Sequence, residues 1–431
     1  MSKRIAIIGG GAAGMMAAAT LLEKNVDAEI HIFEKNPSLG KKVIISGGGR
    51  CNVTTGITDR PILEQKYVRG SQFLKPAQAN FPPEKVYAWF ESHGVPLKNE
   101  PDNRVFPVSD RGEDIVQVFQ KMFIQHQVHI HFNESIKKLI PISSAAASLV
   151  HSAEGFSLVS SSMPHADPFD FVIITTGGNA YRHTGSTGDG YDFARACGHT
   201  VTTLGPSLNS FEVAEQWPKD LSGISFPNAA LSIGQGKEKI RVQGPFLFTH
   251  FGISGPLPFA FSAHVAFMPI TKNEPLIVSF SPEANMSFED WSERLQNAQS
   301  DSGARQIHTV LSVFLPKRFI EALLTIASVS PQRQIATLTK DERKLLAHLL
   351  AGEMKLTLFA RRPGDEFVTA GGINTDEIDR KTMQSKICSQ LYFAGEVMNV
   401  DGVTGGFNLQ VAWSTGRLAG ESIAKQLIAQ N

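Results

Sequence analysis

A glycine-rich segment near the N-terminus constrains the fold of this chain more than any other feature. Gly9-Gly10-Gly11-Ala12-Ala13-Gly14 follows Lys3 to Ile8, which has the apolar, β-branched composition of a short buried strand. It opens Ala12 to Lys24, which is rich in the helix formers Ala, Met and Leu. A further apolar run, Glu29 to Phe33, predicts the next strand. This order of strand, tight turn, helix and strand predicts a βαβ unit and therefore a parallel sheet.

The spacing of these glycines, G-x-G-x-x-G, is typical of a loop that binds the pyrophosphate of a dinucleotide. Gly9 permits the turn out of the strand, and Gly11 lets the backbone approach the phosphates at the positive end of the helix. Gly14 allows helix and strand to pack closely. The motif therefore predicts a bound dinucleotide at this turn.

An acidic residue, Glu34, ends the second strand twenty residues after Gly14. A carboxylate at this place accepts hydrogen bonds from the ribose hydroxyls of an adenosine. It also disfavours a 2′-phosphate, so NADP is a poor candidate for this pocket. NAD and FAD both remain compatible with the turn and its acid.

A second glycine-rich segment, Gly40 to Asn52, follows the acid closely and carries three cations. Lys41, Lys42 and Arg50 can neutralise phosphates, while the glycines, including Gly49, expose backbone N–H groups. Arg50 can alternatively orient a carboxylate of the substrate. Cys51 is expected to be a small buried residue near the cofactor, in preference to a redox thiol.

A third glycine-rich block lies near the C-terminus. Leu391 to Ala394 has the composition of a buried strand, Gly395 and Glu396 follow it, and Val403 to Gln410 leads into a long final helix predicted over Leu409 to Ile428. The positive end of that helix suits the anionic edge of a reduced flavin. Asp401 is positioned to accept from a ribityl chain. Glycine-rich helix starts at both ends of the chain favour FAD, held between them.

Length and composition set the broad class. The 431 residues exceed one compact core, so two or three domains are expected. Lys plus Arg equals Asp plus Glu at 41 each, which gives no overall electrostatic case for nucleic acid or an anionic membrane. The three cysteines are far apart and form no C-x-x-C pair, which argues against a disulfide framework, a zinc site or a redox dithiol beside a flavin. A reducing, cytoplasmic setting is the simplest interpretation.

The start of the chain has an alternative interpretation. Lys3 and Arg4 precede the apolar stretch Ile5 to Leu22, which superficially resembles a secretory signal. The glycines that interrupt the stretch favour the strand, turn and helix instead. No stretch of about 20 uninterrupted apolar residues is present in the sequence, so a membrane span is not expected.

Changes in composition divide the chain into parts. Strand-like runs at His129 to Phe132 and Phe171 to Ile174 belong with the N-terminal unit. We expect an α/β fold: a discontinuous Rossmann-like FAD-binding domain with an inserted small antiparallel β-barrel domain and a helical insert. The expected boundaries are 1–195 and 362–431 for the FAD-binding domain, 196–286 and 353–361 for the barrel-like domain, and 287–352 for the helical insert.

Within the expected barrel, Gly234-Gln235-Gly236 predicts a hairpin turn, and Lys239 to Val242 and Phe246 to Phe248 are predicted as two short strands. Within the insert, Thr339-Lys340-Asp341-Glu342 fits a capping box, and Pro316 separates two helical stretches.

These blocks resemble the bacterial aminoacetone oxidase family, also labelled BaiN-like NAD(P)/FAD-dependent oxidoreductases, within the glutathione-reductase-like FAD superfamily. The resemblance runs from end to end. It rests on six blocks: Ile8 to Ala17, Gly40 to Asn52, Thr184 to Tyr191, Phe248 to Pro256, Thr369 to Ile373 and Ala394 to Gly416. The Ser-Gly-Gly-Gly-Arg-Cys-Asn and Thr-Gly-Gly-Phe-Asn-Leu-Gln sequences are its most specific parts.

The resemblance implies a three-part design of FAD domain, small barrel and helical insert, and it places further residues at the cofactor. Ser135 and Ile136 are implied beside the adenine, and Thr176, Gly177 and Gly178 at the end of another strand. Motifs and resemblance together give this set of expected FAD-contacting residues: Gly9, Gly11, Ala12, Ala13, Gly14, Glu34, Lys35, Lys41, Lys42, Gly49, Arg50, Cys51, Asn52, Ser135, Ile136, Thr176, Gly177, Gly178, Gly395, Glu396, Asp401, Gly406, Asn408, Leu409 and Gln410.

The sequence predicts an FAD-dependent oxidoreductase that carries out two-electron chemistry on a small organic substrate, with NAD(P)H as a transient donor or O₂ as acceptor. The segment Gly185 to Gly190 lacks a βαβ frame of its own, so a dedicated pyridine-nucleotide domain is not expected. Two alternatives stay open: a flavoenzyme that modifies a macromolecule, and a flavin-binding sensor or interaction protein without turnover.

The catalytic residues cannot be assigned from the pattern, and the histidines form no metal set. His250 lies in a loop bounded by Gly and Pro, where it fits either a role on the substrate side or a hydrogen bond to the barrel backbone. Neither nucleic acid nor a membrane is expected as a partner, and the oligomeric state is open.

Overall fold

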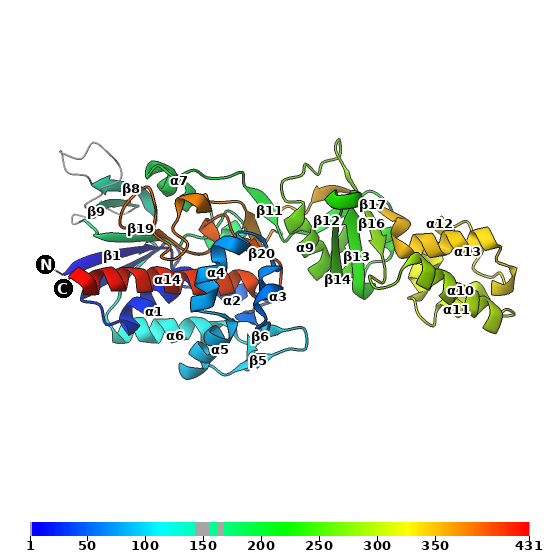
Figure 1. Cartoon of the computed structure of the whole chain (residues 1–431), viewed down its shortest axis with the longest axis horizontal. Coiled ribbons are helices and arrows are strands. Elements are labelled where there is room, and N and C mark those ends of the chain that lie inside the picture. The colour runs from blue at the N-terminus through cyan, green and yellow to red at the C-terminus, as the bar shows by residue number, and fades with distance from the viewer. Residues whose placement is uncertain (1, 143–154, 162–167, 365, 431) are drawn as a thin grey trace. The chain divides into compact units, whose positions relative to one another are not determined.

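The computed structural model describes residues 2–142, 155–161, 168–364 and 366–430. Two compact units make up the chain: a first unit of residues 1–206 and 367–431, and a second unit of residues 207–366. The chain passes from the first to the second within the short strand β11 (Gly205–Ser207). The first unit is therefore built from both ends of the chain (Figure 1).

The first unit is built on a five-stranded parallel sheet with the order β19-β10-β1-β2-β7. Its strands are β1 (Lys3–Ile8), β2 (Ala28–Glu34), β7 (His129–Phe132), β10 (Phe171–Ile174) and β19 (Leu391–Phe393). The strand predictions are confirmed: β1, β2, β10 and β19 are mostly buried and mostly apolar, as expected for strands covered on both faces, whereas β7 at the edge is partly exposed and contains two histidines. All five carboxyl ends meet at one edge of the sheet, and the glycine turn lies there.

Two helices from opposite ends of the chain cross closely in the first unit. α1 (Ala12–Glu23) and α14 (Phe407–Gln430) lie side by side (Figure 1). A Cβ atom at Gly416 would stand 2.3 Å from the carbonyl oxygen of Ala13, and one at Gly420 would stand 2.8 Å from that of Ala17. Only residues without a side chain permit this approach, which joins the two glycine-rich helix starts in one unit.

Smaller elements surround the sheet. The helices of this unit are α2 (Lys41–Ile45), α3 (Arg60–Glu64), α4 (Ser71–Asn80), α5 (Pro83–Ser92), α6 (Gly112–Gln125) and α7 (Asp189–Ala196). The short antiparallel pairings involve β3 (Thr54–Thr55), β4 (Tyr67–Arg69), β5 (Leu97–Asn99), β6 (Arg104–Pro107), β8 (Ile136–Ile142), β9 (Gly155–Ser160) and β20 (Asp401–Gly402). The strand β18 (Val368–Ala370) brings the chain back into the unit.

The second unit contains a closed antiparallel barrel with the order β12-β15-β14-β13-β16-β17. Its strands are β12 (Phe211–Val213), β13 (Ser225–Ile233), β14 (Ile240–Thr249), β15 (Gly252–Ser254), β16 (Leu276–Ser281) and β17 (Met354–Arg361). The predicted fold class, a parallel Rossmann-like sheet with a small antiparallel barrel and added helices, is confirmed.

One prediction within the barrel is wrong. Lys239 to Val242 and Phe246 to Phe248 were expected as separate strands, but they form the single strand β14. Pro245 lies inside it, where the pairing with β13 shifts register between Phe226 and Ala229. A proline has no N–H to donate, so it is accommodated at such an irregularity without ending the strand.

The helices of the second unit are α8 (Trp217–Asp220), α9 (Pro256–His264), α10 (Phe288–Asp301), α11 (Ile307–Leu311), α12 (Lys317–Ile326) and α13 (Lys340–His348). The predicted capping box is confirmed, since Thr339 and Glu342 each bond the other's backbone N–H. Phe319 of α12 packs edge-to-face on Phe226 of the barrel, with 5.0 Å between ring centroids. Barrel and helices thus share one apolar core.

The three cysteines are buried and free. Although Cys197 and Cys388 lie far apart in the sequence, their thiols lie in hydrogen-bonding contact. That contact, together with burial, raises the pKa of Cys197, and it lowers the pKa of Cys388. This pair could not be predicted from the sequence, because a contact between distant segments is set by the tertiary fold. Among the described residues, no helix is long and apolar enough to cross a membrane.

Candidate FAD site

The glycine turn after β1 has the geometry of a phosphate loop. Gly9 has a φ of +113°, and a Cβ there would stand 2.6 Å from the carbonyl oxygen of Thr175. A Cβ at Gly14 would stand 2.0 Å from the carbonyl oxygen of Gly9. A Cβ at Gly11, in contrast, would meet no atom within 4 Å. Gly9 and Gly14 are therefore required by the protein itself, whereas Gly11 opens onto space beside the turn.

The start of α1 carries no capping side chain. Gly11 is its N-cap residue, so the N–H groups of the first turn lack the side-chain oxygen that a Ser or Asp cap would supply. These donors, at the positive end of the helix, are suited to an anionic group. The turn thus fits the pyrophosphate that the motif predicted.

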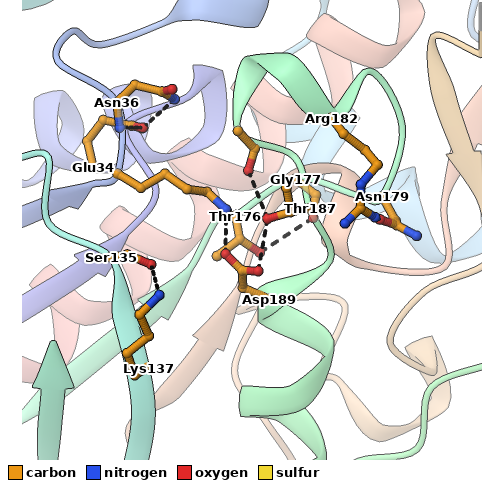
Figure 2. A network of polar contacts seen from close by, with 12 residues as sticks. Glu34, Asn36, Ser135, Lys137, Thr176, Gly177, Asn179, Arg182, Thr187 and Asp189 are labelled. Carbon is orange, nitrogen blue, oxygen red and sulfur yellow. Dashed lines mark hydrogen bonds and ion pairs between the residues drawn. The ribbon is translucent and has the colours of Figure 1, made fainter. Parts of the chain in front are cut away.

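Glu34 is held firmly at the carboxyl end of β2. Its side chain accepts from the backbone N–H of Gly10 at 2.8 Å, from the backbone N–H of Asn36 at 2.8 Å and from Asn36 Nδ2 at 2.7 Å (Figure 2). The residue is 8% exposed. Oε1 thus accepts two bonds and Oε2 accepts one, so the protein orients the carboxylate and Oε2 keeps a lone pair that can accept from a ribose hydroxyl.

The residues after Glu34 connect it to Gly185 to Gly190, a segment for which no function was predicted from the sequence. Lys35 Nζ donates to Thr187 and pairs with the Asp189 carboxylate, while Asn36 Nδ2 donates to the carbonyl oxygen of Thr184 at 3.0 Å. Figure 2 shows Thr187 and Asp189 beside the turn that carries Thr176 and Gly177. The Gly185 to Gly190 segment is therefore part of the predicted adenosine end. Its acid in a glycine-rich run was the signal that could have placed it there.

The segments implied beside the adenine also lie at this end. Ser135 follows Glu134, whose backbone N–H donates to the carbonyl oxygen of Glu34 at 3.0 Å. Ser135 Oγ accepts from Lys137 Nζ at 3.2 Å (Figure 2), and Ile136 is buried at the start of β8. Both residues therefore belong to the neighbourhood of Glu34.

A second group of contacts joins α2 to the carboxyl ends of β18 and β19. Lys42 Nζ donates to Glu396 Oε2 at 2.9 Å, and the backbone N–H of Thr369 donates to Glu396 Oε1 at 2.9 Å. A Cβ at Gly178 would stand 2.5 Å from Thr369 Oγ1. Gly395 precedes this acid with a φ of +79° and donates its N–H to Thr415 Oγ1 at 2.9 Å. The two glycine-rich blocks therefore meet through an ion pair.

An unsatisfied polar atom lies where these blocks meet. The side-chain oxygen Oδ1 of Asn52 is buried and has no hydrogen-bond partner among the described residues. A Cβ at Gly406, just before α14, would stand 3.0 Å from this oxygen and 2.2 Å from the carbonyl oxygen of Thr54. A buried amide oxygen of this kind requires a donor, and the ring N–H of a flavin is one that would satisfy it. The residues present therefore fit FAD.

Other expected residues have side chains engaged within the protein. Arg50 Nη1 donates to Glu100 at 2.7 Å and lies 3.5 Å from Asp110, and the guanidinium stacks 3.8 Å from the ring centroid of Phe106. The hydrogen bond to Glu100 raises the pKa of Arg50. Its charge is matched by carboxylates within the protein, and its contact with a phosphate or a substrate carboxylate stays a prediction.

The C-terminal block shows the same pattern. Asp401 is fully buried and paired with Arg69 through both carboxylate oxygens. Asn408 accepts from the N–H of Gly402 and donates to its carbonyl oxygen, both at 2.9 Å. Gln410 is fully buried and donates to Ser414 and to the carbonyl oxygen of Phe81. Contacts of these side chains with FAD stay predictions, and the structure gives them partners that fix the backbone instead.

Two further expected residues, Cys51 and Lys41, also have side chains that are buried or bound within the protein. Cys51 is buried with a φ of +59°, and burial raises the pKa of its thiol to about 12, so it fits the expected small buried residue and not a nucleophile. Lys41 Nζ donates to the carbonyl oxygen of His183 at 2.9 Å.

His250 lies in the second unit, where it is exposed and packs edge-to-face on Phe251. In the described part of the chain, no group of three or more His, Cys, Asp and Glu residues could hold a metal ion.

The parallel sheet, the phosphate turn and the ribose acid together define a Rossmann-type dinucleotide-binding protein, and the buried Oδ1 of Asn52 fits FAD as the dinucleotide. The chain belongs to the HI0933-like family, whose Rossmann-domain model matches residues 3–422.

Curated relatives match the chain from end to end. It is 28% identical over 433 residues to a protein of Clostridium scindens named 3-dehydro-bile acid delta(4,6)-reductase, covering 98% of this chain and 99% of the relative. It is 27% identical over 435 residues to a protein of Haemophilus influenzae named ribosomal RNA dihydrouridine synthase, covering 97% and 98%.

Among solved structures, the chain resembles a 3-ketosteroid delta1-dehydrogenase from Sterolibacterium denitrificans, with a TM-score of 0.52 and 12% identity over 98% of this chain and 99% of that one. At this identity the likeness shows the fold alone. Family and relatives identify the chain as an FAD-dependent oxidoreductase.

Proposed function

We propose that this protein reduces a carbon–carbon double bond conjugated to a carbonyl group in a small organic molecule, with NAD(P)H as the electron donor. The observation that carries the proposal is the shared chemistry in the names of its end-to-end relatives. A delta(4,6)-reductase of a 3-dehydro bile acid and a dihydrouridine synthase both add two hydrogens to such a bond. The two relatives differ in the size of the substrate that their names give, a bile acid in one and ribosomal RNA in the other.

We favour a small substrate over RNA because the chain carries 41 basic and 41 acidic residues. Binding to a nucleic acid backbone depends on clustered cations that replace counterions, and a neutral balance gives no basis for such a surface. RNA is therefore one arm of the test below.

The chain's own residues would supply binding and orientation. The N–H groups at the start of α1 would hold the pyrophosphate, and Glu34 would fix the adenosine ribose. The Lys42–Glu396 pair and Asn52 would line the opposite part of the cofactor. FAD, when bound, supplies the two-electron chemistry. The other expected FAD-contacting residues stay predictions; for Arg50, Asp401 and Gln410 we expect contact through the backbone, because their side chains bind within the protein.

We also propose that the helical segment 287–352 is dispensable for holding FAD, because the expected cofactor residues lie at positions 9–178 and 395–410. Limited proteolysis near residues 298–304, which cover the end of α10 and the turn after it, should leave FAD bound. Loss of flavin after that cut alone would contradict a separable insert.

Anaerobic stopped-flow spectroscopy tests the proposed reaction. The oxidised holoprotein is mixed with NADH, NADPH or an amine, and the reduced protein is then mixed with a steroid dienone, a simple enone, an rRNA fragment that contains uridine, O₂ or buffer alone. We expect rapid bleaching by one nicotinamide and rapid reoxidation by the dienone or enone, with saturated product and ping-pong kinetics. Fast reduction by an amine with fast reoxidation by O₂ would overturn the reductase proposal, and reoxidation by the rRNA fragment alone would overturn the small-substrate proposal.

A further inference from the structure

A cavity of about 490 Å³ lies in the first unit, and none of its lining residues belongs to the expected FAD-contacting set. One wall is the start of α4, and the other is the loop between β18 and β19 (Figure 1). A volume of this size is typical of sites for small molecules. The lining includes one aromatic ring, two carboxylates and three cations: Phe73, Asp376, Asp379, Arg380, Lys381 and Lys386.

The three cations of the lining are available to a ligand. The side chains of Arg380 and Lys381 are exposed and form no hydrogen bond or ion pair with other described residues. Lys386 Nζ donates one hydrogen bond, to the carbonyl oxygen of Asp376 at 2.9 Å, and keeps two further N–H groups. The cavity therefore carries positive charges that no direct ion pair within the described part of the chain neutralises.

The two carboxylates narrow the choice of ligand. Asp379 Oδ1 accepts from the backbone N–H of Lys381 at 2.8 Å, which orients the carboxylate at the cavity. A bare phosphate ion would be repelled by Asp376 and Asp379 while it was attracted by the cations. A nucleotide instead offers its phosphates to the cations and its ribose hydroxyls to the carboxylates. The half-buried ring of Phe73 adds an apolar face on which a base can stack.

Both walls of the cavity are attached to the loop 395–402. α4 directly follows β4, which pairs with β20 at Asp401. The other wall follows Ile373, whose carbonyl oxygen accepts from the backbone N–H of Asn399 at 2.9 Å. The same loop contains Glu396, which is proposed to line the part of FAD opposite the adenosine. A ligand in the cavity would therefore lie beside the loop that holds the reacting end of the cofactor.

We propose that this cavity binds the phosphates and the adjoining ribose of the nicotinamide nucleotide donor. Arg380, Lys381 and Lys386 would pair with the phosphates, and the two aspartates would accept from the ribose hydroxyls. The inference rests on the proposed use of NAD(P)H. It gives the donor a site although the sequence carries a single glycine motif of the Rossmann kind.

Binding of ADP-ribose and of its 2′-phosphate to the FAD-saturated holoprotein tests this. These probes carry the phosphates and ribose of NADH and NADPH without the reactive ring, and FAD already fills its own site. We expect isothermal titration to show saturable binding of at least one probe. The variant Arg380→Gln/Lys381→Gln should bind that probe at least ~10-fold more weakly, because two charge-assisted contacts are lost. The matched control Lys24→Gln/Lys121→Gln removes two exposed charges of the same unit outside the cavity and should bind like the wild type.

The proposal is overturned if the wild type binds neither probe, if the cavity variant binds as tightly as the wild type, or if the control weakens binding equally. Displacement of the probe by inorganic phosphate of equal affinity would indicate a simple anion site and would also overturn it.

Stopped-flow spectroscopy separates this inference from the proposed function. The concentration of NAD(P)H that gives half the maximal rate of flavin reduction should rise at least ~10-fold in the cavity variant and stay unchanged in the control. An unchanged concentration in the cavity variant would place the donor elsewhere and refute the inference. If NAD(P)H reduces the flavin of neither protein, the proposed function fails, and the titration with the two probes still decides whether the cavity binds the nucleotide.

Discussion

The two glycine-rich helix starts, at α1 and α14, differ in whether the surrounding residues leave space and hydrogen-bonding groups for a ligand. At α1 a Cβ at the cap residue Gly11 would meet no atom within 4 Å, and the adjacent acid Glu34 keeps a lone pair on Oε2. At the start of α14 the protein leaves no such space. A Cβ at Gly406 would stand 2.2 Å from the carbonyl oxygen of Thr54, and Asn408 accepts from the backbone N–H of Gly402. The first start is shaped to receive a ligand through its backbone and acid. The second uses its polar side chains to fix its own loop, while the buried Oδ1 of Asn52 beside it has no hydrogen-bond partner among the described residues.

The strongest test of this difference is Asp401→Asn. Asp401 is fully buried and paired with Arg69, so removing its charge should lower the free energy of unfolding by about 3–5 kcal/mol. FAD affinity of the molecules that remain folded should change little. Urea unfolding of the apoprotein and FAD titration measure the two effects separately. A large loss of affinity at unchanged stability would restore Asp401 as a direct ligand of the ribityl chain.

Within the first start, Gly14→Ala and Gly11→Ala form a matched pair. The new Cβ at residue 14 would stand 2.0 Å from the carbonyl oxygen of Gly9, so the apoprotein should lose about 1–3 kcal/mol of stability. The new Cβ at residue 11 meets no protein atom within 4 Å, so the apoprotein should melt normally while FAD binds at least ~10-fold more weakly. Equal melting temperatures for the two apoproteins would contradict this assignment.

Glu34→Gln probes the acid with little change in shape. It should weaken FAD binding by about 1.5–3 kcal/mol, because charge-assisted bonds to the ribose become neutral ones. The bonds from Gly10 and Asn36 should lose strength too, so a smaller loss of stability is expected. Isothermal titration with FAD and with FMN separates the effects, since FMN has no adenosine ribose and should bind both proteins equally.

The smallest effect concerns Cys51. Because burial raises the pKa of its thiol to about 12, native holoprotein should leave it unmodified by iodoacetamide at neutral pH, with no change in the flavin spectrum. Mass spectrometry of peptides from native and denatured samples measures this. Rapid native alkylation of Cys51 with loss of the flavin spectrum would instead indicate an accessible thiol at the cofactor.

The sequence predicted the sheet well because its strands carry local signals. The apolar run before the glycine turn matches β1 at both ends, and the runs for β7 and β10 match equally. One strand was wrongly split in two where local and tertiary effects compete, at Pro245 within β14. A proline predicts a break locally, and only the bulged pairing in the barrel explains its tolerance.

The sequence pattern could not predict the direction in which individual side chains point. A motif predicts that a segment lies at the cofactor, but it does not say whether a side chain faces the ligand or the protein. Arg50 turns to Glu100, and Gln410 turns to Phe81 and Ser414, because partners distant in sequence satisfy them. The contact of Cys197 with Cys388 was hidden for the same reason.

The most direct measurement is the identity and amount of flavin in the purified protein, compared with the Gly11→Ala and Glu34→Gln variants. We expect a yellow protein that releases about one FAD per chain on acid treatment and no FMN. Both variants should remain folded but contain less bound FAD than the wild type. A folded protein that carries FMN, or one that is colourless and cannot be reconstituted with FAD, would contradict the assignment of this site.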